Sequence, residues 1–208
     1  MRVLVIGCGG HGQVVADILL RMNELSAPVT VVGFLDDDAA QTGRRYLDLQ
    51  VLGKVSDRRA VEHDAVVIAV GDNRVRQRLA AEFTSDGERF ATARHPSAVI
   101  APDVSIAPGT MICAGVVVNT GSVIGAHAIL NTACSVDHHN RIGDCALIGP
   151  GVHMGGDVRI GTGVLIGIGS IVMPQRQVGE WTVVGAGSVV TSDLPSGVTA
   201  LGTPARVR

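Results

Sequence analysis

Aromatic side chains are nearly absent from this chain of 208 residues, which has one Trp, one Tyr and three Phe. Bulky rings fill much of an ordinary globular core. Their scarcity, together with 27 glycines, therefore favours a core of small and β-branched side chains in a repeat punctuated by glycine. Charge of one sign is also lacking: the net charge of −2 leaves no electrostatic footprint for nucleic acid.

Long apolar runs and paired cysteines are missing as well. No stretch reaches the ~18 apolar residues of a membrane span, and the N-terminal run MRVLVIGCGGHG lacks the small-residue cleavage site of a signal peptide. Cys8, Cys113, Cys134 and Cys145 form no CxxC pair, which favours buried reduced thiols over disulfides or zinc ligands. We therefore expect a cytoplasmic protein without a membrane partner.

Residues 1–95 have the pattern of a small Rossmann-like α/β domain. A strand over 3–6 leads through the glycine-rich turn 7–12 into a helix over 13–21, and two further strands are predicted over 29–35 and 65–70. Strands that alternate with helices predict a parallel sheet, whose ligands bind at the carboxyl ends of the strands. The glycine-rich turn and two polar clusters all fall at such ends.

Residues 96–208 follow a six-residue repeat. An aliphatic residue recurs at every sixth position, and most positions four residues later are small or β-branched. The aliphatic positions are Ile100, Ile106, Ile112, Val118, Ile124, Leu130, Val136, Ile142, Ile148, Met154, Ile160, Ile166, Val172, Val178, Val184 and Val190. Two inward residues per short strand, followed by a corner, predict a triangular parallel solenoid. This hexapeptide pattern is typical of a left-handed parallel β-helix with three hexads per coil, and of trimers.

An eighteen-residue coil predicts which distant residues become neighbours. Position n lies one strand spacing, ~4.8 Å, from position n+18, so His138 should point outward from a corner beside Gly156. Histidine titrates near neutral pH and can take a proton from an attacking amine or hydroxyl. A glycine N–H, with no side chain to block approach, can meet the oxyanion of acyl transfer. Asp137, His139 and Asn140 nearby favour a catalytic interpretation over a solvated corner histidine.

Three other interpretations fit less well. The spacing Gly7-x-Gly9-x-x-Gly12 suits a dehydrogenase, but an N-terminal domain with three clear strands is short of a six-stranded dinucleotide fold. A metal-dependent carbonic anhydrase on the same solenoid would need three converging histidines. An inert solenoid would not require the polar cluster around His138.

A metal site is not expected. His138 and His139 are adjacent, and neighbouring side chains of extended backbone point to opposite sides, so one ion would not easily reach both. His127 and His153 are out of the eighteen-residue register with His138.

Five motifs occur together: VIGCGGHG at 5–12, FLDD at 34–37, AVGDN at 69–73, NTACSVDH at 131–138 and GTPAR at 202–206. Over almost the whole chain they resemble the bacterial nucleotide-sugar acetyltransferases of the bacillosamine-pathway and sialic-acid O-acetyltransferase type. The resemblance implies transfer of an acetyl group from acetyl-CoA to a UDP-linked amino sugar. Sugar O-acetylation and non-catalytic binding of a nucleotide sugar are the alternatives. The resemblance does not identify the sugar, the nucleotide or the length of the acyl chain.

The resemblance also implies roles for individual residues. His138 would be the general base and the Gly156 amide the oxyanion donor. The nucleotide sugar would contact Gly9, Gly10, His11, Asp36 and Asp37, and more loosely Asn73 and Arg76. Acetyl-CoA would lie in a groove between two subunits of a homotrimer, against Asn131, Ile168, Ala186 and Arg206.

Two positions depart from the family pattern. The residue after the catalytic histidine is often acidic in these relatives and supports its basicity, but here it is His139. Asp137 and Asp157 are the acidic residues that the sequence and the stacking rule offer instead. Some relatives carry a cofactor-facing histidine where this chain has Leu147.

Overall fold

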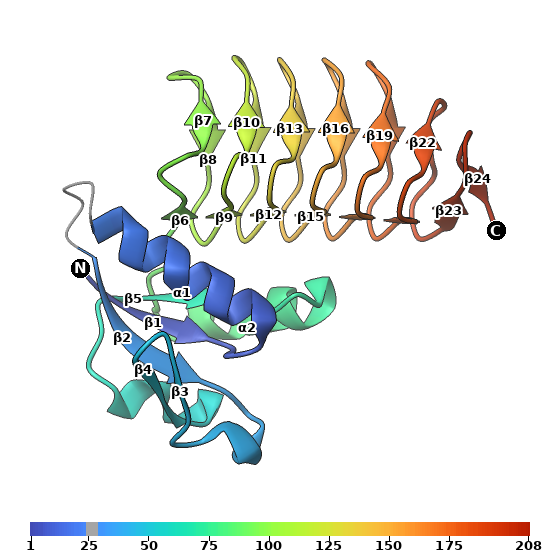
Figure 1. Ribbon diagram of the computed structural model, residues 1–208. Coiled ribbons are helices and arrows are strands. Elements are labelled where there is room, and N and C mark those ends of the chain that lie inside the picture. The colour runs from blue at the N-terminus through green and yellow to red at the C-terminus, as the bar shows by residue number, and fades with distance from the viewer. Residues whose placement is uncertain (24–28) are drawn as a thin grey trace. The chain divides into compact units, whose positions relative to one another are not determined.

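The computed structural model describes residues 1–23 and 29–208, which divide into two compact units, Met1–Pro96 and Ser97–Arg208. The first unit combines helices with a sheet, and the second is a solenoid of very short strands (Figure 1).

The N-terminal unit is built on one five-stranded sheet. Its strands are β1 Arg2–Ile6, β2 Thr30–Leu35, β3 Arg45–Tyr46, β4 Leu49–Gly53 and β5 Ala65–Ile68, in the spatial order β3-β4-β2-β1-β5. β3 and β4 pair antiparallel, and the other pairs are parallel. The remaining elements are the helices α1 Gly10–Asn23 and α2 Asn73–Ser85, the 3₁₀ helices Ala39–Gln41 and Val55–Ala60, and β6 Ala93–Arg94.

The three strands expected from the sequence correspond to β1, β2 and β5, whereas the β3–β4 hairpin was not expected. β3 has only two residues, too few to show the period-two alternation by which a strand is recognised. α1 starts at Gly10 rather than at residue 13, so its first turn includes part of the glycine-rich segment. A methyl group at Gly12 would lie 2.0 Å from the Gly7 carbonyl oxygen, so only glycine permits this close approach.

α2 follows β5 and buries one face against the sheet. Its N-terminus is capped by Asp72, whose Oδ1 accepts from the N–H groups of Arg74 and Val75, both at 2.9 Å. Such a cap typically contributes ~1 kcal/mol. The core around this helix consists of Leu4, Ile6, Leu35, Val66, Ile68, Leu79, Ala80 and Phe83.

The C-terminal unit coils through three sheets, whose strands pair in parallel except for the antiparallel pair of β23 and β24. Sheet I contains β7 Val99–Ile100, β10 Val117–Val118, β13 Ser135–Val136, β16 His153–Met154, β19 Ile171–Val172 and β22 Val189–Val190. Sheet II contains β8 Ser105–Ile106, β11 Val123–Ile124, β14 Arg141–Ile142, β17 Arg159–Ile160 and β20 Gln177–Val178. Sheet III includes β9 Met111–Ile112, β12 Ile129–Leu130, β15 Leu147–Ile148, β18 Leu165–Ile166, β21 Val183–Val184, β23 Thr199–Leu201 and β24 Arg206–Val207.

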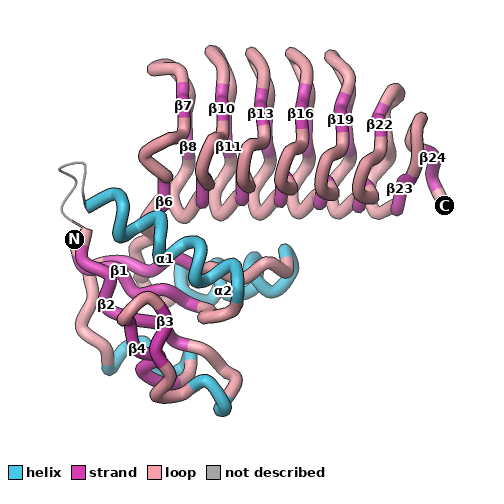
Figure 2. Tube along the Cα trace, viewed as in Figure 1, coloured by secondary structure: helices cyan, strands magenta, loops and turns pink. Residues whose placement is uncertain are grey.

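Strands from β7 to β22 pair in parallel with the next coil at a spacing of eighteen residues, as Val117 with Ser135 and Ser135 with His153. The last parallel pair, β21 with β23, has Val183 opposite Thr199. The repeating aliphatic positions are buried from Ile112 onward and partly exposed at Ile100 and Ile106, in the first coil. Corners of four residues separate the two-residue strands (Figure 2). The predicted hexapeptide solenoid is confirmed, because the ladder joins equivalent hexads coil by coil.

Candidate active site

The two residues expected to form a catalytic pair are neighbours in the solenoid. His138 lies at the corner after β13, between sheets I and II, and Gly156 holds the same position one coil later, after β16. A methyl group at Gly156 would lie 2.3 Å from Cε1 and 2.4 Å from Nε2 of His138. The imidazole therefore rests on the Gly156 backbone, in space that only glycine leaves open.

The other side of the His138 ring meets His139. Their Nδ1 atoms are 3.0 Å apart, and the rings are nearly perpendicular at 78°. The expectation that these side chains point to opposite sides is wrong, because the corner is not extended: His139 has a φ of 58°, in the left-handed region. At this distance the two Nδ1 atoms can form a hydrogen bond, in which one nitrogen carries the proton and the other accepts it. With that proton on His138 Nδ1, Nε2 above Gly156 keeps its lone pair.

Asp137 accepts its hydrogen bonds from the corner backbone and from Asn119, and its charge also interacts with the His138 imidazole. Its Oδ1 accepts from Asn119 Nδ2 (2.9 Å) and from the His138 N–H (2.8 Å). The Asn119 hydrogen bond, followed by that from His138, lowers the pKa of the Asp137 carboxyl. Asp157, the other acidic residue that the sequence offers, donates its N–H to the His138 carbonyl (3.0 Å). Both aspartates therefore hold the backbone around His138.

Asp103 is an acidic neighbour of His139 that the sequence reasoning missed. The His139 ring covers Gly121, where a methyl group would lie 2.5 Å from Cδ2. Asp103 Oδ2 accepts from Thr120 Oγ1 (2.7 Å) and the Gly121 N–H (2.9 Å). These bonds lower the pKa of Asp103, and attraction to His139 contributes less. The sequence feature that could have predicted this contact is the spacing of two coils between Asp103 and His139. Gly121 lies in the coil between them and has no side chain to separate them.

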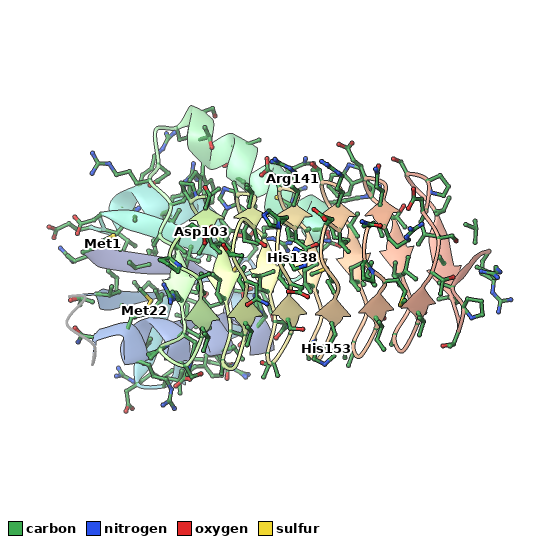
Figure 3. All side chains as sticks on the ribbon, turned by 90° about the horizontal axis from the view of Figure 1, so that it is seen from above. Met1, Met22, Asp103, His138, Arg141 and His153 are labelled. Atoms are coloured by element: carbon green, nitrogen blue, oxygen red, sulfur yellow. The ribbon has the colours of Figure 1, made fainter. Side chains whose placement is uncertain are left out.

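The described residues include no group of three His, Cys, Asp or Glu side chains that could hold a metal ion. His153 lies on β16, where its Nδ1 is 2.8 Å from Ser135 Oγ. Figure 3 shows the labelled His138 and His153 at separate places on the solenoid.

The glycine-rich turn and the end of β2 form a pocket of about 220 Å³ in the N-terminal unit. Asp36 joins them: its Oδ2 accepts from the Cys8 N–H (2.8 Å) and its Oδ1 from the Asp38 N–H (2.9 Å). Burial opposes ionisation of Asp36, but these hydrogen bonds prevail and lower its pKa. The pocket is lined by Cys8, Gly9, Gln13, Asp36, Asp38, Gln41 and Tyr46.

The expected nucleotide-sugar residues divide between this pocket and other places. Gly9 and Asp36 line the pocket, and Gly10 has open space where a side chain would begin. Asp37 instead accepts from the Val55 N–H (3.0 Å) and supports the loop after β4. The pocket lining also includes four residues that the sequence did not lead us to expect: Gln13, Asp38, Gln41 and Tyr46. Of these, Asp38 extends the acidic run, and Tyr46 is the lone tyrosine of the chain.

Half-buried His11 lies in a second cluster with the buried Asn73 and Arg76, at the carboxyl end of β5. Arg76 donates to the carbonyls of Val70 (2.7 Å) and Gly71 (3.3 Å) and to Asn73 Oδ1 (2.8 Å). Burial, and then the charge of Arg76, lowers the pKa of His11 to about 4. His11 Nε2 is buried without a hydrogen-bond partner among the described residues. The low pKa favours the neutral form of His11, and His11 is not among the residues that line the pocket of Gly9 and Asp36.

The residues expected to face acetyl-CoA lie at the corners between sheets III and I. Asn131, Ile168 and Ala186 follow β12, β18 and β21, and Ile168 is 62% exposed. Within one chain, this corner lies at the opposite end of sheet I from the His138 corner. Arg206 is on β24, near the C-terminus, and is also exposed.

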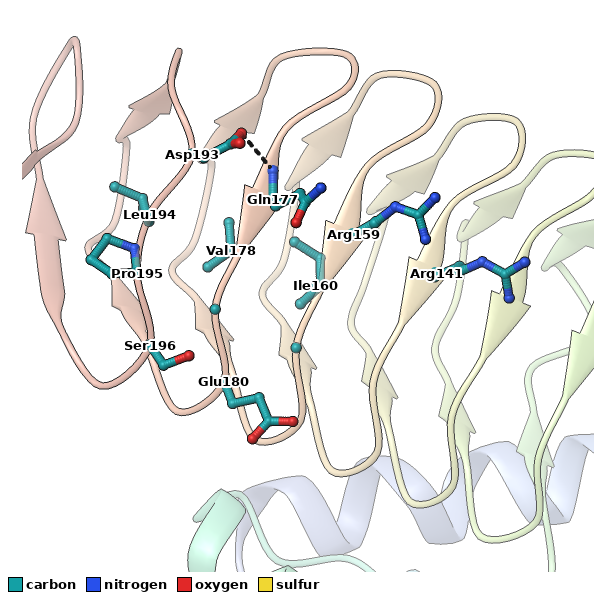
Figure 4. Close-up of a pocket in the computed structure, with 12 residues that line it drawn as sticks. Arg141, Arg159, Ile160, Gln177, Val178, Glu180, Asp193, Leu194, Pro195 and Ser196 are labelled. Carbon is teal, nitrogen blue, oxygen red and sulfur yellow. Dashed lines mark hydrogen bonds between the residues drawn. The ribbon is translucent and has the colours of Figure 1, made fainter.

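One groove lies at neither of these two corners. It has a volume of about 630 Å³ along the outer side of sheet II, where Arg141, Arg159 and Gln177 follow one another (Figure 4). His138 and Gly156 are not among its lining residues.

Comparisons with known proteins match both units. A family model described as the PglD N-terminal domain matches residues 2–83, and one described as bacterial transferase hexapeptide (six repeats) matches residues 157–192. UDP-N-acetylbacillosamine N-acetyltransferase of Bacillus subtilis is 34% identical over 107 residues, which are 50% of this chain and 48% of that protein. The chain thus matches about half the length of this curated relative.

Solved structures match over the full length. A single-residue variant of perosamine N-acetyltransferase from Caulobacter crescentus, in complex with CoA and GDP-perosamine, is 37% identical with a TM-score of 0.92, covering 100% of this chain and 97% of that one. The acetyltransferase domain of PglB from Neisseria gonorrhoeae, in complex with acetyl coenzyme A, is 32% identical with a TM-score of 0.91, covering 100% and 98%. These matches confirm a Rossmann-like domain followed by a left-handed β-helix.

Proposed function

Because the chain belongs to the bacterial nucleotide-sugar acetyltransferases that join a PglD N-terminal domain to hexapeptide repeats, we propose that it moves an acetyl group from acetyl-CoA to the amine of a nucleotide-linked amino sugar. The observation that carries the proposal is the His138 imidazole resting on the Gly156 backbone. A base and an amide donor then share one wall, as acyl transfer requires.

The reaction proceeds through a tetrahedral intermediate. His138 Nε2 accepts a proton from the sugar amine as the nitrogen attacks the thioester carbonyl, while Nδ1–H donates to His139 Nδ1. The carbonyl oxygen becomes an oxyanion that accepts from the Gly156 N–H. The intermediate collapses, the carbon–sulfur bond breaks, and the CoA thiolate takes the proton from the His138 imidazolium.

The nucleotide sugar binds to the N-terminal unit. Gly9 and Asp36 line its pocket, and Gly10 offers open backbone. His11 follows them at the start of α1, with a buried ring nitrogen that has no hydrogen-bond partner among the described residues. Asn73 positions Arg76 through their hydrogen bond. One relative is named for a UDP-linked sugar, and another was solved with GDP-perosamine. A panel of nucleotides is therefore needed to identify the base of the substrate.

Acetyl-CoA binds between two subunits of a homotrimer. In support, the Asn131, Ile168 and Ala186 corner lies across sheet I from His138 in one chain, so a neighbouring subunit is needed to bring these walls together. Exposed apolar side chains on the solenoid, at Val99, Ile168, Ile171 and Met173, offer surface for that contact. Arg206 is then positioned to contact the outer part of CoA.

The cytoplasm is the proposed location. The four cysteines are free and buried, as expected in a reducing compartment. Among the described residues, no helix has both the length and the apolar character needed to cross a membrane.

The first test is an assay of acetyl-CoA with a panel of UDP-, GDP- and dTDP-linked amino sugars, and with free sialic acid to detect O-acetylation. Thiol release and the mass of the product are measured together. We expect N-acetylation of one nucleotide sugar, and a loss of ~10²–10⁴ in turnover in His138→Ala. Binding of a nucleotide sugar without thiol release would favour a non-catalytic binding protein, and wild-type turnover in His138→Ala would remove the base assignment.

A further inference from the structure

Asn140 is a polar side chain inside the apolar core of the solenoid. Asn140 is completely buried. It lies four residues after the repeating aliphatic residue of its hexad, where most other hexads carry Val, Ala, Cys, Ser or Thr. Burying a carboxamide is costly unless its donors and acceptor are paired. The hydrogen-bond partners of the Asn140 carboxamide therefore identify the part of the backbone that it stabilises.

The carboxamide joins the corner of His138 to the corner of Gly156. Asn140 Nδ2 donates to the Asp137 carbonyl (2.7 Å) and to the Gly155 carbonyl (3.0 Å). Its Oδ1 accepts from the Val158 N–H (2.6 Å). Two carbonyls on one side and an N–H on the other leave no ambiguity about which atom is nitrogen.

These bonds alter the corner that carries Gly156. In neighbouring corners the turn closes on itself, as in the bonds from Val152 N–H to the Gly149 carbonyl and from Val164 N–H to the Gly161 carbonyl (3.3 and 3.4 Å). At 155–158 the carboxamide lies between the corresponding carbonyl and N–H. Asn140 therefore sets the spacing of this corner, whereas at 149–152 and 161–164 the turn closes by its own hydrogen bond.

The peptide that Asn140 holds is the one that bears the Gly156 N–H. In a trans peptide the carbonyl and the N–H point in opposite directions. The Gly155 carbonyl points inward to the buried Asn140, so the Gly156 N–H points outward, where the His138 ring lies. The Asp137 carbonyl is held in the same way, with a second donor from Ser122 Oγ (2.9 Å).

We infer that Asn140 is a positioning residue that fixes the distance between the His138 base and the Gly156 amide. The inference rests on the proposed acetyl transfer, in which both groups act on the same thioester carbon. Asn140 touches neither substrate. It acts through the two peptides, and a displacement approaching 1 Å at such a site can cost ~10²-fold in rate.

The test compares three variants. Asn140→Val places in this coil the residue that Val152 and Val164 show to be compatible with the fold, and lets the corner close on itself. Asn140→Ser returns a donor, since Ser122 and Ser170 at equivalent positions donate to the carbonyl fifteen residues later, both at 2.9 Å. The control is Thr110→Val, which removes a similar buried bond to Gly125 (2.8 Å) at a corner between sheets II and III.

We expect Asn140→Val to lower kcat ~10–100-fold with KM for both substrates near the wild-type value, as for a weakened oxyanion interaction. Asn140→Ser should recover much of this loss, and Thr110→Val should keep wild-type kcat. Wild-type kcat in Asn140→Val, or an equal loss in Thr110→Val, would overturn the inference.

A crystal structure of Asn140→Val gives an answer that does not depend on turnover. We expect the Gly155–Gly156 peptide to shift relative to His138, and an unchanged position would contradict the inference. If the wild-type protein transfers no acetyl group to any acceptor, the proposed function fails, and this structural comparison still decides whether Asn140 sets the corner.

Discussion

Gly156 is the residue at which one methyl group should matter most. In Gly156→Ala the new Cβ would collide with Cε1 and Nε2 of His138, while φ at this position is not in the left-handed region. The backbone can therefore accept alanine, and the ring must move. We expect kcat to fall ~10²-fold with little change in melting temperature.

The matched control places the same change in His138→Ala, where the ring is absent and the methyl group has room. We expect Gly156→Ala to cost little further activity in that background. An equal loss in both backgrounds would show that the methyl group harms the amide directly and not through the imidazole.

His139 tests how the base is held. His139→Asn keeps a residue that tolerates the left-handed corner but removes the ring nitrogen 3.0 Å from His138 Nδ1. A hydrogen bond to a charged partner contributes ~1.5–3 kcal/mol, so kcat should fall ~10–100-fold. A variant with unchanged kcat, measured at saturating substrates, would show that His138 does not need this partner.

At the scale of elements, two glycines of the glycine-rich turn have different roles, one in stability and one in substrate binding. Gly12→Ala puts a methyl group 2.0 Å from the Gly7 carbonyl oxygen, where backbone must move, so we expect a loss of about 1–3 kcal/mol in unfolding free energy. Gly9→Ala adds a methyl group in open space beside the pocket. It should keep wild-type stability and raise KM for the nucleotide sugar. Chemical unfolding and steady-state kinetics separate the two effects.

The half-buried His11 of α1 makes the free energy of unfolding depend on pH. Burial, assisted by Arg76, lowers the pKa of His11 from 6.5 to about 4. Between these values the unfolded chain binds more protons than the folded one, so the stabilisation is complete above pH ~6.5 and decreases as the pH falls toward 4. The contribution of Asp36, whose folded pKa is lowered, is lost only at more acidic pH.

We therefore expect His11→Asn to weaken the fall in unfolding free energy between pH 7 and pH 4.5. Urea unfolding of both proteins at several pH values measures this slope. Identical slopes would show that His11 does not titrate differently in the folded state.

For the whole molecule, the prediction concerns a site shared between subunits. Mixed trimers of His138→Ala chains and Ile168→Glu chains would contain some sites with both an intact base and an intact CoA wall. Random mixing in equal amounts should restore roughly a quarter of the wild-type activity. Trimer mass from light scattering and exchange of labelled subunits are the controls. Verified mixed trimers without activity would place both residues in one subunit's site.

The sequence by itself determined the solenoid and the pairing of its coils. An unbroken six-residue repeat leaves one register that turns the repeating aliphatic residues inward, so the position of His138 beside Gly156 follows from counting eighteen residues. The glycine-rich turn and the acidic run after β2 likewise marked the pocket edge, because parallel strands present their carboxyl ends together.

The tertiary structure alone decided what surrounds these residues. Whether the His138 and His139 rings meet depends on the sign of φ at a corner, which the hexapeptide pattern does not specify. The burial of His11 against Arg76 and the bonds of Asn140 to two successive corners arise from side chains that the fold brings together. A repeat determines the backbone path because every coil repeats the same packing, whereas each polar contact depends on one local arrangement.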